Sequence, residues 1–284
     1  MLLTQRILYL VSFDEIEPAV TAQVAEISKA LSAPVFLVAG LGTGSGLWRN
    51  RHDEEVQARA GLESVADNLR ARRASLGHTL VLKGNRAVVA MEAAERMEAD
   101  FIVVGAGESS RQDPTFVRTT AKILARTARE HVWICKPEAD AALQHVLCAF
   151  NESRGSADGI RVSVDLCRQF NAKLQLLSVL QEPDAGLVGG SEQERDEAIE
   201  ASRRQLHDRR LAALDGFNVS GVALARNIVW DTAASQAVLA EAGRHPEGLL
   251  TLGVSGRRRF PAMMLGNTAE KILRHCPSSL LLVK

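Results

Sequence analysis

The strongest constraint on this chain is that it repeats its own pattern once. One pair of segments, 6–41 and 145–180, aligns at a constant offset of 139, and a second pair, 101–136 and 249–284, aligns at an offset of 148. Two matches with nearly equal offsets, one at each end, indicate a tandem duplication. The sequence therefore predicts two domains, residues 1–140 and 141–284, with the seam near Pro137 to Ala142.

Each copy begins with an apolar run, a polar turn, a segment of helical period and a second apolar run, which is the pattern of a β-α-β unit. Strands that alternate with helices predict parallel strands joined by right-handed crossovers. An aromatic share of 4% beside 46% hydrophobic residues suits helices packed on a parallel sheet better than a sandwich or barrel. The expected fold is α/β: two tandem five-stranded parallel-sheet α/β/α sandwich domains, Rossmann-like, with strand order 3-2-1-4-5.

The charge balance excludes some partners. The chain has 34 Lys and Arg against 34 Asp and Glu, and both halves are balanced. Nucleic-acid and anionic-membrane surfaces need an excess of basic residues, so neither is expected as a partner. The apolar start of the chain is interrupted by Arg6 and reads as a strand, not a signal peptide, and no apolar stretch is long enough to span a membrane. We therefore expect a cytoplasmic protein.

The four cysteines, Cys135, Cys148, Cys167 and Cys276, are widely spaced and form no CxxC pair. That pattern fits a reducing compartment, with each thiol acting as a small core residue. The histidines lack the spacing of zinc ligands, and we expect no metal site.

In an open parallel sheet the ligand crevice lies beyond the carboxyl ends of the first and fourth strands. In the second half these ends are Asn151 and the string that opens at Gly253. The spacing of that string is GxxG, nine residues and a further glycine. It consists of Gly253-Val254-Ser255-Gly256, followed by Arg257, and it ends with Gly266-Asn267-Thr268 before a helix. Glycines let backbone N–H groups approach a polyanion, and the start of a helix offers unpaired N–H groups. The alternative interpretation is that these glycines only form a turn and fit a crowded helix start.

The whole string, with its following helix and the terminal strand SLLLVK, resembles the nucleotide-binding signature of the universal stress protein family. The resemblance covers essentially the entire chain, one copy per half, and tandem members have this layout. It implies ATP as the ligand, with a phosphate and ribose side formed by Gly253, Val254, Gly256, Gly266, Asn267 and Thr268, and with charge from Arg257. Asn151 stands where ATP-binding members have an aspartate near the adenosine, and Asn267 stands where Ser or Thr is usual.

The first half departs further from this signature. Gly105 is retained, but Glu108 corresponds to Gly256, Arg118 corresponds to Gly266, and Ser12 stands at the aspartate position. A carboxylate opposes an anion, and an arginine side chain fills the space that a glycine leaves free. We therefore predict that the first half does not bind ATP in the manner of the family.

Other motifs give weaker signals. The glycine-rich residues 40–46 do not have the required third glycine of a dinucleotide-binding loop, and GxxxxGK[ST] does not occur. No Ser/His/Asp set or carboxylate pair is brought together by the repeat, so we expect a binding or regulatory protein and not an enzyme. Two alternatives stay open: a slow ATPase, and a scaffold that binds no ATP or holds another small ligand.

The last strand of each half, VWICK and SLLLVK, is apolar, and an unpaired apolar edge is an association site. By resemblance to family dimers, we expect these strands to pair within the chain as an intramolecular pseudo-dimer. The resemblance also implies that two chains can associate as a homodimer.

Overall fold

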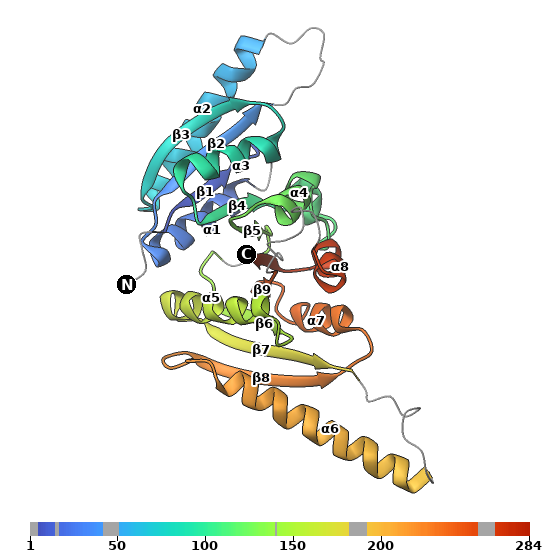
Figure 1. Cartoon of the computed structure of the whole chain (residues 1–284). Helices are drawn as coiled ribbons and strands as arrows, with labels where there is room; N and C mark the ends of the chain where they lie inside the picture. The colour runs from blue at the N-terminus through green and yellow to red at the C-terminus, as the bar shows by residue number, and fades with distance from the viewer. Residues whose placement is uncertain (1–4, 15–16, 42–50, 140, 182–191, 255–264) are drawn as a thin grey trace.

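The computed structural model describes residues 5–14, 17–41, 51–139, 141–181, 192–254 and 265–284 (Figure 1). In the first half the elements are β1 (Ile7–Leu10), α1 (Glu17–Leu31), β2 (Val35–Leu41), α2 (Arg51–Ala71), β3 (Leu76–Lys83), α3 (Arg86–Met97), β4 (Phe101–Gly105), a short 3-10 helix η1 (Glu108–Arg111), α4 (Thr119–Thr127) and β5 (His131–Cys135). In the second half they are β6 (His145–Phe150), α5 (Arg154–Phe170), β7 (Lys173–Leu180), α6 (Glu192–Asp215), β8 (Ala223–Trp230), α7 (Ala234–Ala242), β9 (Leu249–Gly253), α8 (Asn267–His275) and β10 (Ser279–Val283).

The ten strands of the described residues belong to one sheet with the order β3-β2-β1-β4-β5-β10-β9-β6-β7-β8. Within each half the strand order is 3-2-1-4-5, and the strands are parallel. The predicted fold class is therefore confirmed, including the alternation of strand and helix in both halves. In each half the first strand pairs with the fourth, so the reversal of strand order falls where the sequence places the ligand crevice.

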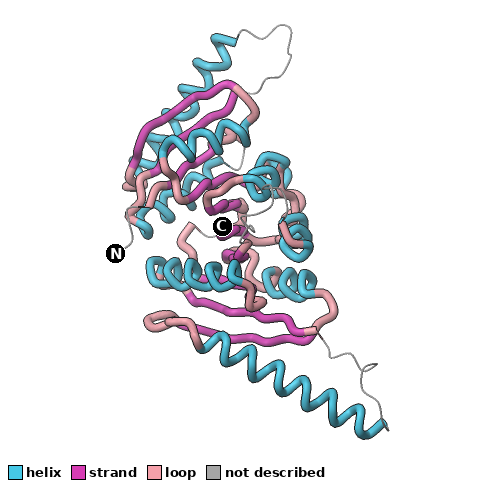
Figure 2. The backbone as a smooth tube through the Cα atoms, viewed as in Figure 1, coloured by secondary structure: helices cyan, strands magenta, loops and turns pink. Residues whose placement is uncertain are grey.

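The helices cover both faces of the sheet (Figure 2). Successive residues of a strand point to opposite faces, and Ile7 and Tyr9 lie in one core while Leu8 and Leu10 lie in the other. The first core includes residues of α1, α2, α5 and α6, and the second includes residues of α3, α4, α7 and α8. Strands buried on both sides explain why the sequence shows continuous apolar runs instead of alternation.

The two halves meet through the terminal strands β5 and β10, which pair antiparallel. Leu281 lies opposite Trp133 in the β5–β10 ladder. Next to it, the backbone N–H of Lys136 donates to the Ser279 hydroxyl at 3.0 Å, and the Lys284 Nζ donates to the Ala125 carbonyl at 2.6 Å. Figure 1 shows the C-terminus in this central region, between the two halves.

The four cysteines, all within the described residues, are buried in the core and are not joined by disulfides. Burial raises the pKa of Cys148 and of Cys167 to about 12. Within the described ranges, no helix has the length and apolar character to cross a bilayer, and no group of three or more His, Cys, Asp or Glu side chains is arranged to hold a metal ion. Of the glycine-rich segment 40–46, Gly40 and Leu41 end β2, and the remainder lies outside the described residues.

Candidate functional site

A cavity of about 840 Å³ opens at the carboxyl edge of the sheet in the second half. It lies where β6 and β9 end side by side and where α5 and α8 begin. Six of the eight residues that the sequence predicts for ligand binding line this one cavity: Asn151, Gly253, Val254, Gly266, Asn267 and Thr268. The other two, Gly256 and Arg257, lie outside the described residues. The structure thus brings together residues that are about a hundred positions apart in the sequence.

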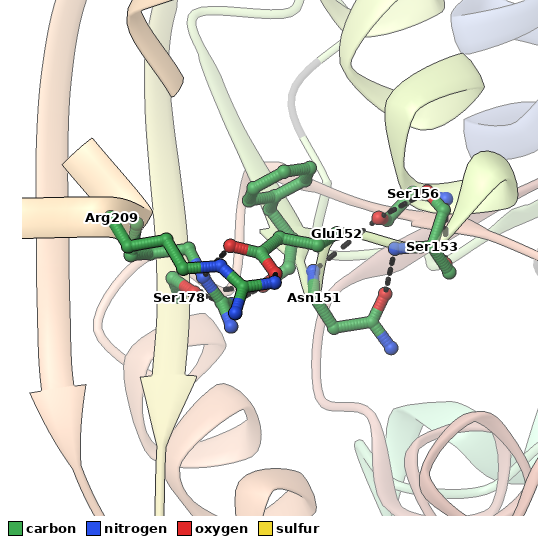
Figure 3. A network of polar contacts seen from close by, with 8 residues as sticks. Asn151, Glu152, Ser153, Ser156, Ser178 and Arg209 are labelled. Carbon is green, nitrogen blue, oxygen red and sulfur yellow. Dashed lines mark hydrogen bonds and ion pairs between the residues drawn. The ribbon is translucent and has the colours of Figure 1, made fainter. Parts of the chain in front are cut away.

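Asn151 follows the last residue of β6, and the start of α5 fixes its backbone. Its N–H donates to the Ser156 hydroxyl at 3.3 Å, and its side-chain Oδ1 accepts from the Ser153 N–H at 3.2 Å (Figure 3). The Ser153 hydroxyl in turn accepts from the Ser156 N–H at 3.2 Å and caps α5. Because Oδ1 is used in the turn, the exposed amide Nδ2 is the group that Asn151 can offer to a ligand.

Gly253 ends β9, and its role differs from that of Gly266. A Cβ built on Gly253 would overlap the Gly155 carbonyl in the first turn of α5, and a Cβ on Gly159 would lie 3.0 Å from the Gly253 nitrogen. The glycines thus let the end of β9 pack directly against α5. The glycine spacing predicts that Gly253 admits a polyanion, whereas the structure gives it a packing role at the cavity wall.

Gly266 is the N-cap of α8, with φ −61° and ψ 154°. Among the described residues, no side chain caps this helix, and no atom lies within 4 Å of a Cβ built on Gly266. The first hydrogen bond of α8 is that of the Glu270 N–H, so the N–H groups of Asn267 and Thr268 stay without intrahelical acceptors. The wall of the cavity therefore carries an open helix N-terminus, which favours negative charge.

Sequence reasoning missed further residues of the wall. Apolar side chains from three elements line it, among them Val179, Val238 and Ile272. Charged groups at the cavity are Arg154, Asp158 and Lys284. The Asp158 carboxylate is paired with Arg161 at 2.6 Å, and burial lowers the pKa of Lys284 to about 8. Val179, Val238, Arg154 and Asp158 lie on other elements than the glycine string and its following helix, so the string does not predict them.

The corresponding crevice of the first half contains its own ion pair. Arg118 is the N-cap of α4 with φ −64° and ψ 155°, nearly the backbone conformation of Gly266. Its Nη2 lies 2.8 Å from Oδ2 of Asp14, whose side chain is 10% exposed. The repeat alignment of Arg118 with Gly266 is therefore correct, and the arginine side chain reaches the end of β1 as the steric argument expects.

A second carboxylate, that of Glu17, lies at the same strand end. Its Oε2 accepts from the N–H groups of Ser12 at 2.9 Å and Phe13 at 3.2 Å, and its Oε1 accepts from the Tyr9 hydroxyl. Burial raises the pKa of Glu17. At the offset of 139, Glu17 corresponds to Ser156, which binds the N–H of Asn151 in the second half. In the first half, the Glu17 carboxylate thus accepts the hydrogen bond of the N–H that follows the strand. In the second half, the Ser156 hydroxyl accepts the corresponding hydrogen bond.

The repeat alignment predicts that the Glu108 carboxylate would oppose an anion, and this stays a prediction. Glu108 opens the 3-10 helix η1, and its side chain is exposed. The structure places two further carboxylates at the crevice, those of Asp14 and Glu17. The sequence offers a way to find both residues, because the offset of 139 aligns Asp14 with Ser153 and Glu17 with Ser156.

Comparison with solved structures agrees with this architecture. A universal stress protein from Archaeoglobus fulgidus superimposes with a TM-score of 0.72 at 16% identity, covering 98% of both chains. A functionally unknown protein from Pseudomonas aeruginosa superimposes with a TM-score of 0.72 at 18% identity, covering 99% of this chain and 92% of its own. At these identities the likeness establishes the fold alone.

A comparison with curated proteins gives no match. The model of the universal stress protein family matches residues 142–284, about half of the chain. This segment contains the whole β6–β10 unit with its cavity, and the first half repeats the same strand order. The chain belongs to the universal stress protein family.

Proposed function

We propose that this protein is a cytoplasmic stress-response protein that binds an adenine nucleotide, ATP, in the cavity of residues 141–284 and acts by binding or regulation. The observation that carries the proposal is the convergence of Asn151, Gly266, Asn267 and Thr268 on one cavity at the reversal of strand order. Membership of the universal stress protein family supports a nucleotide as the ligand class.

The two sides of the cavity suit the two parts of a nucleotide. The uncapped N-terminus of α8 and the guanidinium of Arg154 favour the phosphates. The apolar side chains of Val179 and Val238 favour a flat heterocyclic base. Asn151 also lines the cavity, and its amide can donate to a ribose or base oxygen.

The first experiment is mass spectrometry of small molecules released from the purified protein, followed by titration with ATP. Gly266→Arg should abolish ATP binding because the side chain would extend from the cavity wall, and Arg118 shows that the same backbone conformation accommodates arginine. Gly266→Ala is the matched control and should bind like wild type, since its Cβ meets no described atom. Absence of released nucleotide together with absence of any wild-type titration signal would refute the proposal.

We propose binding without efficient hydrolysis. Among the described residues of the cavity wall, Asp158 alone is acidic and none is a histidine, and Asp158 is held in an ion pair with Arg161. A general base should lie within hydrogen-bond reach of the attacking water and be free to accept its proton. Phosphate release by wild type that Asp158→Asn abolishes would instead support the slow ATPase.

We further propose that the two halves form an intramolecular pseudo-dimer. The boundary between them lies near residues 137–142. The antiparallel pairing of β5 with β10 supports this arrangement. Because that pairing uses the terminal strands within one chain, a homodimer of two chains would need another surface. Sedimentation equilibrium of the full chain, with and without ATP, tests for such a homodimer.

A further inference from the structure

A largely buried guanidinium from α6 contacts the strand end that carries Asn151. Arg210 lies near the C-terminal end of α6, and its side chain is 12% exposed. Its Nη1 donates to the Phe150 carbonyl at 3.3 Å and to the Ser178 hydroxyl, and its Nε donates to Oε1 of Glu152 at 3.2 Å. Arg210 thus contacts the residue before Asn151 and the residue after it.

The strand end needs this support. Glu152 has φ 60°, a left-handed backbone conformation that is uncommon for residues other than glycine. The Arg210 guanidinium also lies over the Phe150 ring, 5.6 Å from its centroid, and the Ser178 hydroxyl donates to the same Phe150 carbonyl at 3.0 Å. A planar donor that satisfies a carbonyl, a hydroxyl and a carboxylate at once fixes the turn more firmly than any single contact.

Figure 3 shows the consequence for the site. Arg209 and Ser178 lie on one side of Glu152, whereas Ser153 and Ser156 lie on the other, and the Asn151 side chain points away from the arginine cluster. Asn151 itself lines the cavity. The turn is thus held from α6 on one side and from the start of α5 on the other, with Asn151 between them.

We propose that Arg210 is a positioning residue for the ligand site: it holds Phe150 and Glu152 so that the Asn151 amide faces the cavity. The identity of the ligand rests on the proposed function, but the positioning does not. Arg209 is the natural control, because its Nη2 donates to Oε2 of the same Glu152 carboxylate at 3.1 Å while its side chain is 72% exposed. An exposed ion pair contributes little to structure.

The test compares Arg210→Ala with Arg209→Ala in the full chain by two measurements. Amide hydrogen exchange, followed by NMR, should be faster at Asn151 and Ser153 in Arg210→Ala and unchanged in Arg209→Ala. ATP titration should show about tenfold weaker binding for Arg210→Ala and a change within about twofold for Arg209→Ala. In an Asn151→Ala background, Arg210→Ala should add less than about twofold, because it acts through Asn151.

Equal exchange rates in the two arginine variants would overturn the positioning role, and so would additive losses of affinity in the double variant. If wild type does not bind ATP, the proposed function fails, and the exchange measurement alone decides the role of Arg210. If Arg210→Ala does not fold, Arg210→Lys and Glu152→Gln replace it. Both should speed exchange at Asn151, and wild-type exchange in both would overturn the inference.

Discussion

Gly253 and Gly155 touch backbone to backbone, so that the end of β9 rests on the first turn of α5 with no room for a Cβ between them. Neighbouring Gly159 extends this contact along the helix. Residues of both elements line the cavity.

Gly253→Ala should therefore destabilise the fold by about 3 kcal/mol, because the added Cβ meets backbone atoms that cannot rotate away. Chemical denaturation of the variant measures this loss. Gly266→Ala is the control and should change stability by less than about 0.5 kcal/mol, since its Cβ enters open space. Equal stability of the two variants would contradict the packing role of Gly253.

The sequence predicts the fold almost completely but cannot separate these two glycines. Hydrophobic periodicity and the internal repeat determine element order, because each strand and helix must bury one continuous face. A glycine spacing, in contrast, records only that side chains are excluded at certain positions. Gly253 excludes one because of α5, which lies about a hundred residues earlier, whereas Gly266 borders an open cavity. Only tertiary distances distinguish a packing constraint from a ligand constraint.

The same limit explains the first-half crevice. The sequence predicts an obstruction from Arg118 and Glu108 by aligning the glycine string alone. The carboxylates of Asp14 and Glu17 come from the segment after β1, at the start of the repeat. There the alignment identifies the strand and the helix but does not predict which side chains lie at the crevice. A side chain's position in the fold decides whether it acts at a site, and the string carries no such information for Glu108.

Glu17 should make stability depend on pH. Burial raises its folded-state pKa above the ordinary value of 4.5, so the folded chain holds this proton more tightly than the unfolded chain. Its contribution to stability is therefore fully present below pH 4.5 and is lost as pH rises through the folded pKa. A proton that the folded chain binds tenfold more tightly than the unfolded chain contributes about 1.4 kcal/mol.

Glu17→Gln removes this titration while keeping an acceptor for the Ser12 N–H and a group that faces the Tyr9 hydroxyl. The unfolding free energy of the variant relative to wild type should rise as pH increases from 4.5 to about 7. Urea denaturation at several pH values measures the difference. A difference that stays constant over this range would show that the pKa of Glu17 is the same in both states.

An ion pair joins the halves next to the cavity. Arg126 on α4 donates to Glu270 in the first turn of α8 through both Nε, at 3.1 Å, and Nη2. This contact lowers the pKa of Glu270. Arg126→Ala should cost about 1 kcal/mol of stability at neutral pH, because the pair is bidentate and partly shielded from water.

Arg274→Ala provides the comparison for this pair, since Arg274 reaches the same carboxylate from a 58% exposed position within α8. It should cost only about 0.3 kcal/mol. Thermal or urea unfolding at low and high salt measures both variants. A larger loss of stability for Arg274→Ala than for Arg126→Ala would show that the Arg126–Glu270 pair between the halves contributes less than the Arg274–Glu270 pair within α8.

The cysteines should be unreactive in the folded protein. All four thiols are buried, and burial raises the pKa of Cys148 and Cys167 to about 12, so the thiolate is scarce at neutral pH. A maleimide reagent at neutral pH should modify the native chain slowly and all four thiols after unfolding. Rapid native modification of any one of them would reveal a thiol that opens to solvent.

The pairing of β5 with β10 joins two segments of the same polypeptide. In an assembly of identical subunits every mutation appears twice, so both crevices must change together. In a tandem chain, each half can accumulate substitutions independently of the other. The first-half crevice contains the ion pair of Arg118 with Asp14, whereas the second half contains the cavity. The proposed function therefore predicts one ATP per polypeptide, bound in the second half, which ATP titration of the full chain measures.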